Sequence, residues 1–263
     1  MPDLYSAPDP AAPSNVPPAW REVMGTALVV AAALFLPYVV AFVIGGITYG
    51  VIAGLSGVRG DGLRDAIAAS LGPPAPGFWI ASIFAVMLMI LATQALARRR
   101  FGDAWRVALG LCSHAIPPSL AAFLLLLLLG YFLWAIGVVT TLQALWPSQA
   151  IMPEITKTVS KAGGTVPLAM TLLVLLAPIS EELLFRGYAF ARMATVLPRD
   201  MVIFVTAAGF ALAHFNGGIL HPLVTLYLGI ATGWLRASHG SILPGIILHG
   251  GVNSLAVAAM LAA

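Results

Sequence analysis

The chain is 263 residues long; 60% of its residues are hydrophobic and only 9% are charged. Because a soluble globular domain carries about 25% charged residues, this composition excludes an ordinary soluble enzyme and predicts a polytopic protein of the lipid bilayer. The net charge of +3 does not indicate nucleic-acid binding, and the single cysteine, Cys112, excludes an internal disulfide or a thiolate metal cluster.

The first part of the chain predicts a tail followed by two membrane spans. Residues 1–20 are rich in Pro and Ala and lack the features of a signal peptide, so we predict a disordered tail. Residues 23–55 and 78–97 are uncharged runs of spanning length, the first with Pro37 as its expected kink. The polar residues 56–76 between them predict a loop.

The middle of the chain predicts an interfacial helix and two more spans. Residues 101–118 mix charged and apolar side chains, which is typical of a short helix lying at the membrane surface. Residues 120–146 predict the third span, and the polar residues 147–165 predict a second loop. The fourth span runs from Val166 toward Arg192. Three further apolar segments follow, at residues 201–215, 219–235 and 242–263.

These segments predict an all-α fold, a transmembrane helical bundle of about seven spans. We divide the chain into the tail (1–20), helices and loops without a motif (21–165) and a motif-bearing region (166–263). The basic residues predict a cytoplasmic N-terminus by the positive-inside rule, because eight of them then lie inside and only four outside. The eight are Arg21, Arg98, Arg99, Arg100, Arg106, Arg192, Arg199 and Arg236, and the four are Arg59, Arg64, Lys157 and Lys161.

The fourth span carries three charged residues within an otherwise apolar helix. Each charge near the bilayer centre costs about 2.5–3.5 kcal/mol, so Glu181, Glu182 and Arg186 require partners or water. Glu182 and Arg186 are four residues apart, share a helix face and can form an ion pair. Glu181 is rotated by about 100° from Glu182 and points elsewhere. One carboxylate is therefore predicted to be neutralised, and the other to be available for chemistry.

Two later spans carry polar residues that should face the bundle interior. His214 follows Phe210 by four residues, and His249 precedes Asn253 by four, so each pair shares one helix face. A carboxylate and an imidazole can take a proton from water, and a second imidazole and an amide can stabilise an oxyanion. Together, Glu181, His214, His249 and Asn253 therefore provide the side-chain types that a hydrolytic site needs.

Three ordered motifs in this region resemble those of the CAAX-protease and bacteriocin-processing family of intramembrane peptidases. They are Glu181-Glu182-x-x-x-Arg186, Phe210-x-x-x-His214 and His249-x-x-x-Asn253. The resemblance implies an intramembrane endopeptidase in which Glu181 and His214 activate water. It also implies that His249 and Asn253 line the oxyanion site, and that Glu182 and Arg186 are structural.

Several alternatives remain open from sequence. Members of the family are often labelled metallopeptidases, and Glu181, His214 and His249 could together hold zinc, but these residues could also work without a metal, and no cofactor is predicted. A non-catalytic scaffold or immunity protein of the same family is the second alternative. The substrate is either a prenylated C-terminus or a bacterial leader or signalling peptide; the preference for Arg over Lys favours a bacterial inner membrane. His221 and His239 are interpreted as interfacial, because they lie at predicted span ends.

Overall fold

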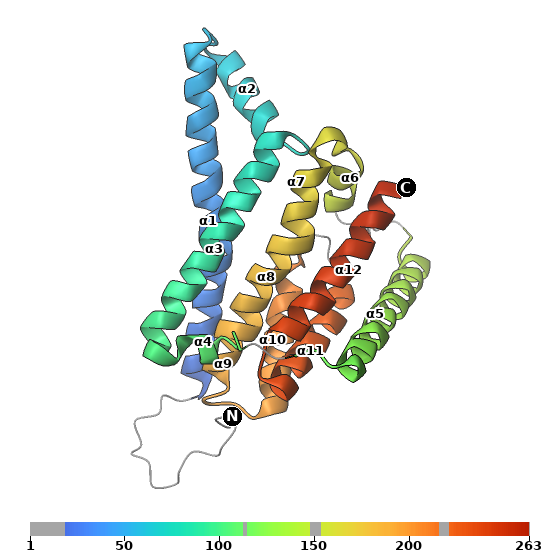
Figure 1. Cartoon of the computed structure of the whole chain (residues 1–263). Helices are drawn as coiled ribbons and strands as arrows, with labels where there is room; N and C mark the ends of the chain where they lie inside the picture. The colour runs from blue at the N-terminus through green and yellow to red at the C-terminus, as the bar shows by residue number, and fades with distance from the viewer. Residues whose placement is uncertain (1–18, 113–114, 148–153, 216–220, 263) are drawn as a thin grey trace.

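The computed structural model describes residues 19–112, 115–147, 154–215 and 221–262, and every regular element among them is helical (Figure 1). The predicted all-α class is therefore confirmed for this part of the chain. The predicted N-terminal tail lies outside the described residues, except that residues 19–20 already form the first turn of α1. Five stretches are long and apolar enough to cross a membrane, which makes the chain an integral membrane protein.

The first three helices form a hairpin of long helices capped by a short one (Figure 1). α1 (Ala19–Leu55) and α3 (Pro76–Phe101) pack along each other, and α2 (Asp61–Leu71) lies between their ends. The predicted loop at residues 56–76 is therefore wrong for most of its length. Leu71 of α2 packs over Gly45 of α1, a contact between elements that the polar local sequence did not reveal.

The predicted interfacial helix is much shorter than expected. Among the described residues of this segment, η1 (Gly102–Ala104) and α4 (Trp105–Ala108) are helical, residues 109–112 and 115–117 form no helix or strand, and α5 (Pro118–Leu145) follows. The second predicted loop also contains helix, because α6 (Glu154–Ser160) and η2 (Gly163–Thr165) lie within it.

The fourth span is one rod in which α-helix alternates with π-helix. It comprises α7 (Val166–Met170), η3 (Thr171–Leu176), α8 (Ala177–Glu182), η4 (Leu183–Ala189) and α9 (Phe190–Met193). π-helical turns, with their i→i+5 hydrogen bonds, are rare and are frequently found at functional sites. Here they flank the short α-helix that carries both carboxylates.

Three helices complete the bundle: α10 (Arg199–Ala213), α11 (His221–His239) and α12 (Leu243–Ala262). α10 and α11 pack so closely that a Cβ on Gly229 would lie 3.1 Å from the backbone of Ala207. The five candidate spans are Ala19–Leu55, Pro76–Ala108, Pro118–Leu145, Gly163–Met193 and Leu243–Ala262. Neither α10 nor α11 is among them, so the predicted count of seven spans stays a prediction.

Two of the arginines that were predicted to share one side of the membrane, Arg100 and Arg192, meet at the same carboxylate. Arg192 Nε of α9 donates to Glu22 Oε1 of α1 at 2.6 Å, and Arg100 Nη2 of α3 lies 3.7 Å from the same oxygen. Figure 1 shows these helix ends close together near α4. Which side of the membrane this end faces stays a prediction.

Candidate active site

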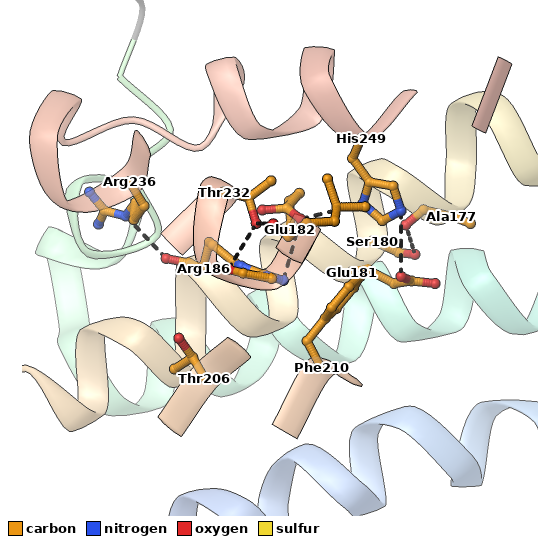
Figure 2. Close-up of polar contacts among 12 residues, drawn as sticks. Ala177, Ser180, Glu181, Glu182, Arg186, Thr206, Phe210, Thr232, Arg236 and His249 are labelled. Carbon is orange, nitrogen blue, oxygen red and sulfur yellow. Dashed lines mark hydrogen bonds and ion pairs between the residues drawn. The ribbon is translucent and has the colours of Figure 1, made fainter. Parts of the chain in front are cut away.

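The three motifs meet in the interior of the bundle, although they come from separate helices. Glu181 and Glu182 end α8, and Arg186 lies in η4, one turn further on. His214 directly follows α10, and α12 carries His249 with Asn253. Figure 2 shows Glu181, Glu182, Arg186 and His249 clustered around the ring of Phe210.

Glu182 and Arg186 form the buried ion pair that their spacing predicts. Both side chains have no exposed surface, and Arg186 Nη1 lies 3.4 Å from Glu182 Oε1. Arg186 Nη2 also donates to the carbonyl of Gly229 at 2.9 Å, and its guanidinium lies 4.4 Å from the centre of the Phe210 ring. The pair therefore joins η4 to α10 and α11, and its charge is compensated within the protein.

The imidazole of His249 connects the two carboxylates. Its Nδ1 lies 3.3 Å from Glu182 Oε1, and its Nε2 lies 3.9 Å from Glu181 Oε2. The ring is almost fully buried and meets Phe210 edge to face. Because a carboxylate only accepts hydrogen bonds, Glu182 fixes a proton on Nδ1 and thereby orients Nε2 toward Glu181.

His214 approaches the same oxygen of Glu181 as His249 does. Its Nε2 lies 3.7 Å from Glu181 Oε2, and the two side chains remain 24% and 19% exposed. Its Nδ1 lies 2.8 Å from the carbonyl of Phe210, so Nδ1 is the donor and carries the proton. In the neutral ring, Nε2 is then the nitrogen with a free lone pair, and it points to the carboxylate. Glu181 Oε2 itself has no hydrogen-bond partner among the described residues.

These groups line a cavity of about 200 Å³ between the fourth span, α5 and the last three helices. Glu181, His214, His249 and Asn253 all contribute to its wall, and Tyr131 of α5 closes one side. Asn253 Nδ2 donates to the carbonyl of Leu173 in η3 at 2.7 Å, so one amide proton is already used to join α12 to the fourth span. The structure thus places all four predicted catalytic residues on one cavity.

His221 is a cavity residue that the sequence interpretation missed. It was interpreted as interfacial, yet it lines the same cavity and its ring lies 5.8 Å from that of His214. Its Nδ1 donates to the carbonyl of His214 at 3.2 Å. The sequence interpretation missed this contact with the cavity, and the position of His221 at the membrane interface stays a prediction. No local pattern distinguishes it from His239, which bonds within its own helix at the other end of α11.

Two further supports of the site also have no sequence signal. A Cβ on Gly245 would lie 3.0 Å from Glu182 Oε2, so this position of α12 needs a residue without a side chain. Arg236, predicted to be a basic residue of the cytoplasmic side, is only 1% exposed. Its Nε donates to the carbonyl of Arg186 at 3.0 Å and its Nη2 to that of Ala108 at 2.8 Å. It ties η4 of the fourth span to α4.

The zinc alternative drawn from the sequence stays a prediction. In the described part of the chain, no group of three or more His, Cys, Asp or Glu side chains is placed to hold a metal ion. The zinc alternative therefore rests on residue types alone.

The comparison with protein families agrees with the motifs. Residues 163–255 match the family described as type II CAAX prenyl endopeptidase Rce1-like. These residues form an Rce1-like domain. The resemblance drawn from the three motifs is thereby confirmed, and the match supports a CAAX-protease-type hydrolase at the level of the family. The searches of curated proteins and of solved structures give no match. Residues 1–162, including α1 to α5, lie outside the Rce1-like domain.

Proposed function

We propose that this protein is an intramembrane endopeptidase that hydrolyses a peptide bond in a membrane-associated protein or peptide. The observation that carries the proposal is the approach of His214 and His249 to one oxygen of Glu181, at 3.7 and 3.9 Å, on the wall of a cavity. The three residues come from three helices of the Rce1-like domain, so only the folded bundle assembles them.

In the proposed mechanism Glu181 and His214 activate the attacking water. The Glu181 carboxylate and the unprotonated Nε2 of His214 are both acceptors, so a water in the cavity donates one hydrogen to each. Its lone pair is then directed at the substrate carbonyl, and the proton released on attack passes to this pair as general base. Glu181 Oε2 and His214 Nε2 lie 3.7 Å apart, so a single water can contact both acceptors.

The tetrahedral intermediate needs donors for its oxyanion, and we assign these to His249 and Asn253. His249 Nδ1 already faces Glu182, so donation from Nε2 requires a doubly protonated ring, whose charge the two neighbouring carboxylates offset. Asn253 has a second amide proton beyond the one given to Leu173. When the intermediate collapses, the C–N bond breaks and the leaving amine takes the proton held by Glu181 and His214.

The substrate class follows from the family and from composition. A prenylated C-terminus or a bacterial leader or signalling peptide fits the family. The preference for Arg over Lys favours a bacterial inner membrane, and the distribution of the basic residues favours a cytoplasmic N-terminus. The zinc-dependent version predicts loss of cleavage with a chelator and recovery with zinc. The metal-free mechanism predicts that a chelator has no effect.

Terminal-peptide profiling of membranes tests the proposal. Cells carry the wild-type protein, Glu181→Gln, a deletion, or Asp65→Asn as a matched carboxylate-to-amide change at an exposed position. We expect a cleavage product that is absent from the Glu181→Gln and deletion membranes and present in the other two. If Glu181→Gln matches the wild type while the deletion differs, the non-catalytic scaffold replaces the peptidase.

A further inference from the structure

A second hollow lies outside the Rce1-like domain, on the surface that faces lipid. α1 and α3 enclose a groove of about 710 Å³ whose wall is almost wholly apolar. Alanines from both helices form its floor, and leucines stand at its edges, where Leu36 and Leu91 are 59% and 58% exposed. The groove exists because small side chains face each other between large ones: Ala32, Ala33, Ala92 and Ala95.

The length of the groove matches one leaflet of a bilayer. Along α3 its lining runs from Leu88 to Arg99, which at 1.5 Å per residue is about 17 Å. The hydrocarbon core of a bilayer is about 30 Å thick, so one leaflet contributes about half of that. The groove therefore fits an acyl chain of a single leaflet.

Arg99 closes one end of the groove, and it differs from the arginines on either side. Arg98 lies over the Trp105 ring at 4.6 Å, and Arg100 approaches Glu22 at 3.7 Å. Arg99 is exposed and lines the groove, and within the described ranges no ion pair or ring contact involves it. Of the three consecutive arginines, Arg99 is thus available to bind an anion at the end of the apolar groove.

The groove is separate from the catalytic cavity. The cavity is lined by α5, the fourth span and the last three helices, whereas the groove is lined by α1 and α3 alone. A chain seated in the groove does not reach Glu181, so its occupant is better explained as a lipid than as the peptide being cleaved.

We propose that this groove binds an anionic phospholipid, with one acyl chain along the alanine floor and the phosphate against Arg99. The apolar lining takes the chain, and the guanidinium takes the phosphate as a charge-assisted, bidentate partner. Basic pockets between transmembrane helices are known to select anionic headgroups, at about 1 kcal/mol for each Lys or Arg near the surface. This proposal does not depend on the peptidase activity.

Native mass spectrometry of the full chain in detergent tests the lipid site. The protein is titrated with phosphatidylglycerol or with phosphatidylcholine of the same acyl chains. We expect tighter binding of phosphatidylglycerol, and Arg99→Gln should weaken it about fivefold, which corresponds to about 1 kcal/mol. Arg98→Gln and Arg100→Gln should keep the preference, since these arginines already have partners in the protein.

A matched pair of adjacent alanines tests the groove itself. Ala32 lines the groove and Ala31 does not, and both are exposed on α1. Ala32→Phe should reduce binding of both lipids, whereas Ala31→Phe should leave it unchanged, with thermal unfolding of each variant as the control for folding. Equal binding of the two lipids by the wild type, equal losses for Arg98→Gln and Arg99→Gln, or full binding by Ala32→Phe would each overturn the proposal.

Discussion

The two adjacent carboxylates, Glu181 and Glu182, lie in contrasting surroundings in neighbouring regions of the bundle. Around Glu182 the structure is closed: the side chain is fully buried, and Arg186 and His249 lie within 3.4 and 3.3 Å of the same oxygen. Around Glu181 it is open: the side chain lines a cavity, and its nearest partners remain 3.7 and 3.9 Å away. The closed region holds helices together, and the open region leaves one carboxylate oxygen without a hydrogen-bond partner among the described residues.

Removing each carboxylate in turn is the strongest test of this comparison. Glu181→Gln should lower formation of the cleavage product by about 10²–10⁴-fold, because the amide has no basic oxygen to accept the proton from water. Its thermal unfolding midpoint in detergent should stay at the wild-type value, since Glu181 Oε2 makes no hydrogen bond to the described residues. A lower unfolding midpoint for Glu181→Gln would instead show that Glu181 stabilises the bundle, as Glu182 does in the closed region.

The ion pair should dominate stability. Arg186→Met leaves Glu182 buried without its cation, and a loss of about 3–5 kcal/mol in the free energy of unfolding is expected. Glu182→Leu together with Arg186→Met removes both charges and should recover much of that loss. Denaturant unfolding in detergent measures the three proteins. Equal instability of the single and double variants would contradict the assignment of the loss to an uncompensated charge.

Gly245 offers a smaller change to the closed region alone. In Gly245→Ala the new methyl group would lie 3.0 Å from Glu182 Oε2 and 3.4 Å from Thr232 Cβ, and we expect a loss of about 1–3 kcal/mol. Gly251→Ala on the same helix is the matched control, because its methyl group would meet Leu128 at an ordinary 3.8 Å. The control should be neutral or slightly stabilising. Equal losses of stability in Gly245→Ala and Gly251→Ala would show that the effect comes from substituting a glycine of α12 and not from the contact with Glu182.

The smallest effect concerns His221 in the open region. His221→Phe removes one hydrogen bond to the backbone of His214, worth about 0.5–1.5 kcal/mol, so the cleavage rate should fall about twofold to tenfold. His239→Phe at the far end of α11 removes a similar bond to the carbonyl of Leu235 and should leave the rate unchanged. Profiling of the cleavage product compares the two. An unchanged rate in His221→Phe would exclude a positioning role for this residue.

The sequence by itself determined the membrane class, the helical fold and the different surroundings of Glu181 and Glu182. Composition is decisive for a bilayer protein, and a helix fixes the directions of residues one and four apart in any tertiary context. The same regularity predicted that His249 and Asn253 share a face, and both line the cavity.

Only the tertiary structure decided which residues outside the motifs complete the site. His221, Gly245 and Arg236 act through partners 7, 63 and 50 residues away in the chain, at His214, Glu182 and Arg186. α2 was hidden for the same reason, because its apolar side chains meet glycines of α1 and not each other. The periodicity of the local sequence predicts which face of its own helix a residue occupies. Which residues it contacts on that face depends on how separate helices pack.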